Sequence, residues 1–298
     1  MSGAPNQVIV GTRGSDLAKA QAAPLVDHLR AKGYEIQWRL FTTSGDRWLE
    51  GPLDKAGGAG FFTKELEAAL LAGEVDLLIH SLKDVALDRP EGIVTACIPE
   101  REDPSDWLLL REDAPDAPVI GTSAVRRERL LKAAMPQATF TWIRGNVPTR
   151  VQRVKEGVLR DAPLHGAVLA GAGLRRLGLD LSGLRFRPLR FDQLVPAPGQ
   201  GALLAETRVD RPDLVEAFAD LNDGPTARAV WLERRVLRGI GGGCQQPLGA
   251  HAEPLEGGGW RLRAAYAGEA GVTRAHAEGE DAAMLVETVL RQLGVPCA

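Results

Sequence analysis

The sequence predicts an α/β protein that ends in a small α+β domain with an antiparallel sheet. Short apolar strands alternate with amphipathic helices from the start of the chain to about residue 210. Several of these strands run directly into turns rich in Gly, Ser, Thr and Arg. After residue 212 the pattern changes to two helices and then a series of strands separated by glycine turns.

The first unit begins with an apolar strand at residues 8–10. Ser15 can cap the helix that follows, which closes near Gly33. The chain then predicts a strand at 36–42, a surface loop at 45–60, a helix from Thr63 and a buried strand at 75–79. That buried strand leads straight into Lys83 and Asp84, so both side chains are expected at its carboxyl end.

A second unit starts near residue 98. Its strands are expected at 119–120, 139–143 and 167–170, and each leads into a helix. A proline-containing segment at 188–198 looks like a hinge, and a strand at 201–206 is expected to return to the first unit. The last part predicts helices at 212–221, 226–237 and 282–293, and strands at 248–252, 260–266 and 272–276.

Composition excludes several classes of protein. Apolar residues make up 44% of the 298 residues, which is typical of a globular protein, and 36 basic against 39 acidic residues give a net charge of −3. This near balance gives no strong electrostatic field that would attract nucleic acid. No apolar run reaches the ~20 residues of a membrane span. We expect a cytoplasmic protein without a signal peptide, with three reduced cysteines and no metal site.

Arginines recur where strands pass into helices. The carboxyl ends of parallel strands meet at one edge of a sheet, where ligands bind, and guanidinium groups pair with carboxylates. Any one of these arginines could be an ordinary surface charge, but the repetition predicts a cleft for a ligand with several carboxylates or phosphates. No Walker A sequence is present, which favours a polycarboxylate. The three junctions are residues 11–15, 121–127 and 144–150.

Cys244 follows three glycines, so its sulfur can be approached closely. A catalytic thiol would need a histidine base, and His80 and His251 are candidates that no spacing ties to it. The alternative is a small buried residue beside a glycine turn. Asp84 also has two possible roles, because its carboxylate could shuttle protons or could simply cap a helix. Cys97 lies in an apolar strand predicted at residues 93–98 and is expected to be inert core.

Nine short motifs lie in order between residues 11 and 245. They are Gly11-Thr12-Arg13-Gly14-Ser15, Phe62-Thr63-Lys64-Glu65-Leu66-Glu67, His80-Ser81-Leu82-Lys83-Asp84-Val85, Gly121-Thr122-Ser123, Val125-Arg126-Arg127, Arg144-Gly145-Asn146-Val147, Ala172-Gly173-Leu174-Arg175-Arg176-Leu177-Gly178, Pro196-Ala197-Pro198-Gly199-Gln200-Gly201-Ala202 and Gly242-Gly243-Cys244-Gln245. Together, and in this order, they resemble the porphobilinogen deaminase family, and the resemblance covers most of the chain.

The resemblance implies three domains and an activity. Two lobes similar to type II periplasmic binding proteins (1–97 with 196–211, and 98–195) would flank a cleft, and residues 212–298 would carry the cofactor. The implied enzyme is a hydroxymethylbilane synthase, which joins four porphobilinogen units, releases ammonia with each and frees a linear tetrapyrrole with water. The implied cofactor is a dipyrromethane held by a thioether to Cys244, and the protein would be a monomer.

The same resemblance implies roles for individual residues. Asp84 would be the catalytic carboxylate, which stabilises the cationic azafulvene formed as ammonia leaves and assists proton transfer. Gln200 matches a hinge motif. The cofactor-binding positions would be Lys83, Thr122, Arg126, Arg127 and Cys244, and the substrate-binding positions Arg13, Ser15, Lys55, Arg144, Arg150 and Arg176.

Two positions depart from the family pattern, and two other classes of function stay open. Ala59 replaces a loop lysine and Ala124 replaces a serine, which removes one cation and one hydroxyl without touching Asp84 or Cys244. A solute-binding protein of the same fold would need neither Cys244 nor a third domain, and would carry a signal peptide. A cysteine hydrolase would need a histidine linked to Cys244.

Overall fold

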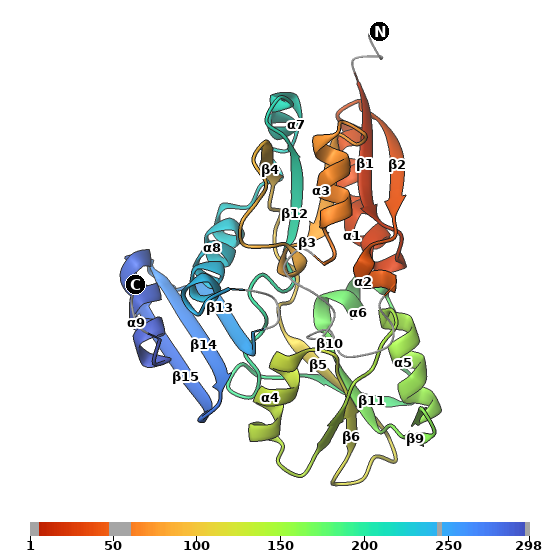
Figure 1. Cartoon of the computed structure of the whole chain (residues 1–298), viewed down its shortest axis with the longest axis vertical. Coiled ribbons are helices and arrows are strands. Elements are labelled where there is room, and N and C mark those ends of the chain that lie inside the picture. Colours follow the sequence, from red (N-terminus) through yellow and green to blue (C-terminus); the bar gives the residue numbers. More distant parts are fainter. Residues whose placement is uncertain (1–5, 48–60, 243–245, 296–298) are drawn as a thin grey trace.

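The computed structural model describes residues 6–47, 61–242 and 246–295. Its strands form three main sheets (Figure 1). The first sheet has the order β2-β1-β3-β12-β4 and is mixed, because β1 is parallel to β2 and β3 whereas β12 is antiparallel to β3 and β4. Its strands are β1 (Gln7–Arg13), β2 (Glu35–Phe41), β3 (Leu77–Ser81), β4 (Ile93–Cys97) and β12 (Leu203–Arg208).

Helices cover both faces of this first sheet. Leu25 and Leu29 of α1 pack with Phe218, just beyond α7, against the apolar side chains of β1 and β3 on one face. Leu66 and Leu70 of α3 pack on the other face. The helices of this part are α1 (Asp16–Ala31), α2 (Ser44–Arg47), α3 (Lys64–Leu71) and α7 (Pro212–Ala217).

The second sheet has the order β11-β5-β10-β6-β7. Helix α4 covers one face, and α5 and α6 cover the other. A short hairpin, β8 (Val158–Leu159) and β9 (Ala162–Pro163), follows α5. The elements are β5 (Asp106–Arg111), β6 (Val119–Gly121), α4 (Val125–Ala134), β7 (Thr139–Thr141), α5 (Val147–Glu156), β10 (Gly166–Ala170), α6 (Gly171–Leu177) and β11 (Leu184–Pro188).

The third sheet is antiparallel and touches both larger units. Helices α8 and α9 pack on one of its faces, while Ala265 and Ala267 of the sheet join the core beneath α4. Val230 of α8 packs with Leu82 and Val85 of the first unit. The elements are α8 (Gly224–Gly239), β13 (Leu248–Pro254), β14 (Trp260–Gly268), β15 (Gly271–Gly279) and α9 (Ala282–Gln292).

The predicted fold class is confirmed: two α/β units are followed by a small domain with an antiparallel sheet. The strand expected to return to the first unit does so as β12. The strands β5, β8, β9 and β11 were not predicted; β5 is a short apolar run, which periodicity alone does not distinguish from a helix. The division into three domains stays a prediction, and Phe218 packs in the core of the first sheet although it lies beyond residue 211.

No helix within the described residues is both long and apolar enough to cross a membrane. Cys97 is fully buried, and burial raises the pKa of its thiol to about 12. The expectation that Cys97 is inert core is therefore confirmed, because a thiol must ionise to react.

Glu233 of α8 joins the third unit to the two segments that connect the larger sheets. Its carboxylate accepts from Arg101, at 2.6 and 3.1 Å, in the segment between β4 and β5. It also accepts from the backbone N–H of Gly199, at 2.7 Å, between β11 and β12, and of Ala252 in β13, at 2.9 Å. Burial would raise the pKa of Glu233, but Arg101 and His251 outweigh it and lower the pKa to about 2.

Glu233→Gln is expected to destabilise the protein by about 3–5 kcal/mol, because Arg101 would keep a buried charge without its counter-ion. The depressed pKa means that this stabilisation is complete above the carboxyl's ordinary value of 4.5 and is lost as pH falls toward 2. Urea unfolding between pH 7 and pH 3 measures both effects, and the variant should show a shallower loss in acid. Glu278→Gln, which breaks a half-exposed pair with Arg261, is the control and should destabilise the protein far less than Glu233→Gln. Equal losses for the two variants would refute the role of Glu233.

Candidate active site

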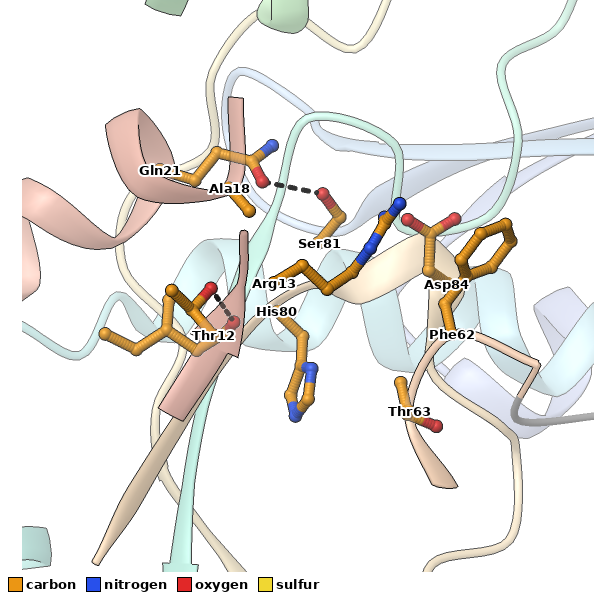
Figure 2. Close-up of a pocket in the computed structure, with 10 residues that line it drawn as sticks. Thr12, Arg13, Ala18, Gln21, Phe62, Thr63, His80, Ser81 and Asp84 are labelled. Atoms are coloured by element: carbon orange, nitrogen blue, oxygen red, sulfur yellow. Dashed lines mark hydrogen bonds between the residues drawn. The ribbon is translucent and has the colours of Figure 1, made fainter. Parts of the chain in front are cut away.

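A pocket lies where β1 and β3 end side by side (Figure 2). Because these strands are parallel, their carboxyl ends meet at one edge of the sheet, the edge at which open α/β sheets bind ligands. The lining residues come from β1, α1, β3 and the segments next to them: Thr12, Arg13, Ala18, Gln21, Phe62, Thr63, Ile79, His80, Ser81 and Asp84.

Asp84 reaches this pocket from the single 3₁₀ turn η2 (Leu82–Asp84) that follows β3. Figure 2 shows Arg13, Phe62 and Asp84 pointing toward one another, while the ring of His80 points away from Asp84. The guanidinium of Arg13 stacks on the ring of Phe62, with its Cζ 4.6 Å from the ring centroid. The pocket therefore offers a carboxylate, a cation and an aromatic face, which suits a flat ligand that gains positive charge as it reacts.

Hydrogen bonds of two serines hold the junction around the pocket. Ser15 caps α1 as predicted, since its hydroxyl accepts from the N–H of Ala18 at 3.2 Å. Ser81 donates to the Oε1 of Gln21 at 3.0 Å. The hydroxyl of Ser15 thus serves the helix, and its expected contact with substrate stays a prediction. Thr63 begins α3, but its hydroxyl makes no capping bond.

A second group of predicted residues gathers around Asp106, the first residue of β5. Its carboxylate is fully buried and forms ion pairs with Arg126 at 2.8 Å and with Arg127 at 2.7 Å. Arg126 also donates to the carbonyl of Val195 at 2.7 Å. Asp106 therefore orients both guanidinium groups, which lie on the first turn of α4.

Gln200 connects this group to the first unit. Its Nε2 donates to the Oδ1 of Asp106 at 3.0 Å. Its Oε1 accepts from the Nζ of Lys83 at 3.3 Å and from Arg127 at 3.4 Å. Lys83 follows β3 and Arg127 follows β6, so a single amide bridges the two units at the site. The sequence placed Gln200 in a hinge motif without this role.

Arg144 and Arg150 lie together beyond the end of β7. Arg144 is buried in the loop before α5, and its Nη2 approaches the carbonyl of Gly45 at 3.5 Å. The Nε of Arg150 donates to the carbonyl of Gly145 at 2.8 Å. Arg176 is engaged elsewhere, because its Nη2 donates to the carbonyl of Gly201 at 2.9 Å.

Thr122 is buried directly after β6, and its hydroxyl accepts from the N–H of Ala124 at 3.3 Å. Ala124 is the N-cap residue of α4 and makes no side-chain cap, as expected of an alanine at this position. Lys55, Ala59 and Cys244 lie outside the described residues. The described residues before Cys244 end at Gly242, shortly after α8, and resume at Gln246.

Positive charge is in excess around the site. Burial, followed by the nearby guanidinium of Arg127, lowers the pKa of Lys83 to about 8. Burial and the neighbours Arg127, Arg144 and Arg153 lower the pKa of Arg150 to about 10. Within the described part of the chain, Asp84 and Asp106 are the carboxylates that act on Lys83, while several arginines repel Lys83 and Arg150, so the arrangement fits a ligand with several carboxylates.

Comparison with known proteins agrees with this geometry. The family model described as porphobilinogen deaminase, dipyromethane cofactor binding domain, matches residues 8–216. The chain belongs to the porphobilinogen deaminase family. Curated relatives with that name include one from Shouchella clausii, 39% identical over 259 residues (85% of this chain and 81% of the relative), and one from Desulforudis audaxviator, 40% identical over 251 residues (82% and 79%).

The resemblance inferred from the motifs is thus confirmed. A solved structure of the methionine-binding protein MetQ covers 76% of this chain and 93% of its own, with 14% identity and a TM-score of 0.43, a level that does not define a shared fold. Membership of the porphobilinogen deaminase family therefore rests on the family model and on the curated relatives.

Within this porphobilinogen deaminase fold, both histidines considered for a hydrolase have other surroundings. His80 is buried with its Nε2 3.4 Å from Glu206, and burial together with Arg89 lowers its pKa to about 3. His251 packs edge-on against Phe191, with ring centroids 4.5 Å apart, and its Nδ1 lies 3.4 Å from Glu233. The lowered pKa of His80 does not suit a general base near neutral pH, and the described partners of His251 are Phe191 and two glutamates.

Sequence reasoning missed three residues that shape the site: Phe62, Asp106 and the bridging amide of Gln200. Phe62 belongs to a family motif, but an aromatic residue at this position gives no indication in the sequence that it contacts Arg13. Asp106 precedes an ordinary apolar run, and nothing local indicates that it meets arginines some 20 residues later. An acidic residue that begins a buried strand was the only available signal, because a buried carboxylate requires a cationic partner.

Proposed function

We propose that this chain is a hydroxymethylbilane synthase. This transferase joins four porphobilinogen units, releases ammonia with each and frees the linear tetrapyrrole hydroxymethylbilane by hydrolysis. The observation that carries the proposal is a carboxylate, Asp84, beside the half-buried cations Arg13 and Lys83, with the buried Arg126 and Arg127 on the adjoining unit. Each porphobilinogen brings an acetate and a propionate, so a growing chain needs many cations in a protein whose net charge is −3.

The residues fit the dipyrromethane that the family uses. Lys83, Arg126 and Arg127 converge on one region, because Gln200 joins Lys83 to Arg127 and Asp106 pairs with both arginines. We propose that these cations hold the cofactor's carboxylates and that Cys244 anchors it through a thioether. When bound, the dipyrromethane supplies the pyrrole carbon at which chain growth begins.

The protein's own contribution is electrostatic. Asp84 would accept hydrogen bonds from pyrrole N–H groups and stabilise the positive charge that develops on the substrate as ammonia leaves. Arg13 would bind a substrate carboxylate while stacked on Phe62, which fixes its direction. Arg144, Arg150 and Arg176 would hold carboxylates further along the chain.

Purified protein incubated with porphobilinogen should release ammonia and a linear tetrapyrrole in proportion to the substrate consumed. Its intact mass should exceed the sequence mass by two linked pyrrole units, and Ehrlich's reagent should colour it. A solute-binding protein would instead bind reversibly without turnover. Active protein of unmodified mass would refute the cofactor assignment, and absence of turnover would refute the function.

The pKa of Lys83, lowered to about 8, predicts a pH dependence of substrate use. Below this pKa the ammonium can pair with carboxylates, and above it the group is neutral, so kcat/KM should fall between pH 7 and pH 9. In Lys83→Arg this decline should disappear, because a guanidinium stays charged over that range. A decline of the same size and midpoint in the variant would show that another group causes it.

We further propose a cytoplasmic monomer that does not bind nucleic acid. The near balance of basic and acidic residues supports the last point, and light scattering with a gel-shift assay would test both oligomeric state and nucleic-acid binding.

A further inference from the structure

Three arginines beyond β7 converge on one short stretch of backbone, residues 141–145. The Nε of Arg150 donates to the carbonyl of Gly145 at 2.8 Å, and the Nη1 of Arg153 donates to the carbonyl of Arg144 at 2.7 Å. The Nη2 of Arg160 donates to the carbonyl of Trp142 at 2.9 Å and to the hydroxyl of Thr141 at 3.1 Å. Two of these guanidinium groups come from α5 and one comes from the hairpin that follows it.

Arg160 lies in the strained turn of this hairpin. Residues 160 and 161 form its two-residue turn, and both are left-handed, with φ of 51° for Arg160 and 60° for Asp161. This turn normally takes Gly or Asn, and an ordinary side chain there is strained. The strained turn sets Arg160 on the indole of Trp142, with its Cζ only 3.4 Å from the ring centroid.

The cluster carries positive charge that the described chain does not neutralise. Among the residues that the structure describes, Arg150, Arg153 and Arg160 form no ion pair with a carboxylate. Burial and the proximity of Arg153 lower the pKa of Arg160. Arg153 and Arg160 each use one guanidinium nitrogen in the hydrogen bonds above, which leaves other N–H groups for a ligand.

These arginines continue the cation group at the site outward. Arg127 is buried beside Asp106, Arg150 and Arg153 are half-buried, and Arg160 is exposed. The positive charges of Arg127 and Arg153 help to lower the pKa of Arg150, and the charge of Arg153 helps to lower the pKa of Arg160. Charge therefore runs stepwise from the cofactor-binding group to the surface, along the side of the second unit where α5 and β9 lie (Figure 1).

We propose that Arg153, Arg160 and the ring of Trp142 form a binding site for the carboxylates and rings of the linear oligopyrrole once it has outgrown the inner cleft. The inference rests on the proposed function. Each added unit brings two carboxylates, so the later intermediates carry more negative charge than the inner cations can pair. A guanidinium stacked on an indole presents both a charge for a carboxylate and a flat face for a pyrrole.

The test follows chain growth unit by unit. Holoenzyme receives limiting porphobilinogen, is quenched at intervals and is analysed by intact mass, which resolves enzyme carrying different numbers of added units. In Arg160→Gln and Arg153→Gln the first addition should keep its wild-type rate, and the last two additions should slow by roughly tenfold for each lost charge-assisted hydrogen bond. Arg160→Lys, which keeps the charge but loses the planar stack, should show a smaller delay.

Lys132→Gln is the matched control, because Lys132 is an exposed cation on α4 of the same unit and pairs only with Glu128 among the described residues. Thermal unfolding confirms that each variant is folded. A distribution of intermediates identical to that of Lys132→Gln, or an equal slowing of all additions, would overturn the proposal. Loss of turnover in the wild type would instead refute the function itself, and the inference with it.

Discussion

Asp84→Ala is expected to lower kcat by about 10²- to 10⁴-fold while the covalent pyrrole mass and the fold are retained. The expected loss is large because Asp84 is the carboxylate of the described pocket, and it faces Arg13 and Phe62 there. Removing it would leave the charge that develops on the substrate without a counter-charge in a partly desolvated site. Ammonia release in a single turnover measures the chemical step directly.

Asp88→Ala is the control for this experiment. Asp88 lies four residues further along, is exposed, and pairs with Arg238 at 2.7 Å, so its loss should leave kcat within about twofold. Asp84→Asn keeps the size of the side chain and removes the charge, and it should lose nearly as much activity as Asp84→Ala. Turnover near the wild-type level in either Asp84 variant would remove Asp84 from its proposed role.

Cys244→Ser is expected to give a folded protein whose intact mass equals the sequence mass and whose activity falls to background. The reason is chemical: a thiolate is a far better nucleophile than a hydroxyl near neutral pH, and without the thioether there is no primer for chain growth. Mass spectrometry and Ehrlich's reagent report attachment, and product formation reports activity.

Cys97→Ala supplies the matched control. Cys97 is fully buried in the core of the first sheet, and burial raises its pKa to about 12, so it is not expected to hold a pyrrole. This variant should keep both the added mass and the activity, at a modest cost in stability. If Cys244→Ser retained the added mass, or if Cys97→Ala lost it, the anchor would have been assigned to the wrong cysteine.

Much of the fold could be predicted because its signals are local. A strand such as β3 is a short apolar run, and α1 shows its apolar face every three to four residues between a serine cap and a glycine. The strands β5 and β11 were missed because short runs of this kind do not by themselves distinguish a strand from a helix, and only their pairing with each other and with β10 shows that they are strands. Pairing of this kind leaves no pattern that one segment can show by itself.

The sequence by itself determined the α/β class, the family and the arginines and carboxylate that follow the strands. Those features depend on short-range periodicity and on motifs that occur along the chain in the same order as in the family. Only the tertiary structure decided how the residues combine: Gln200 meets Asp106 across 94 residues, Glu233 meets Arg101 across 132, and Arg160 meets the ring of Trp142. Buried charges find counter-charges wherever packing brings them together, and packing is a property of the whole chain.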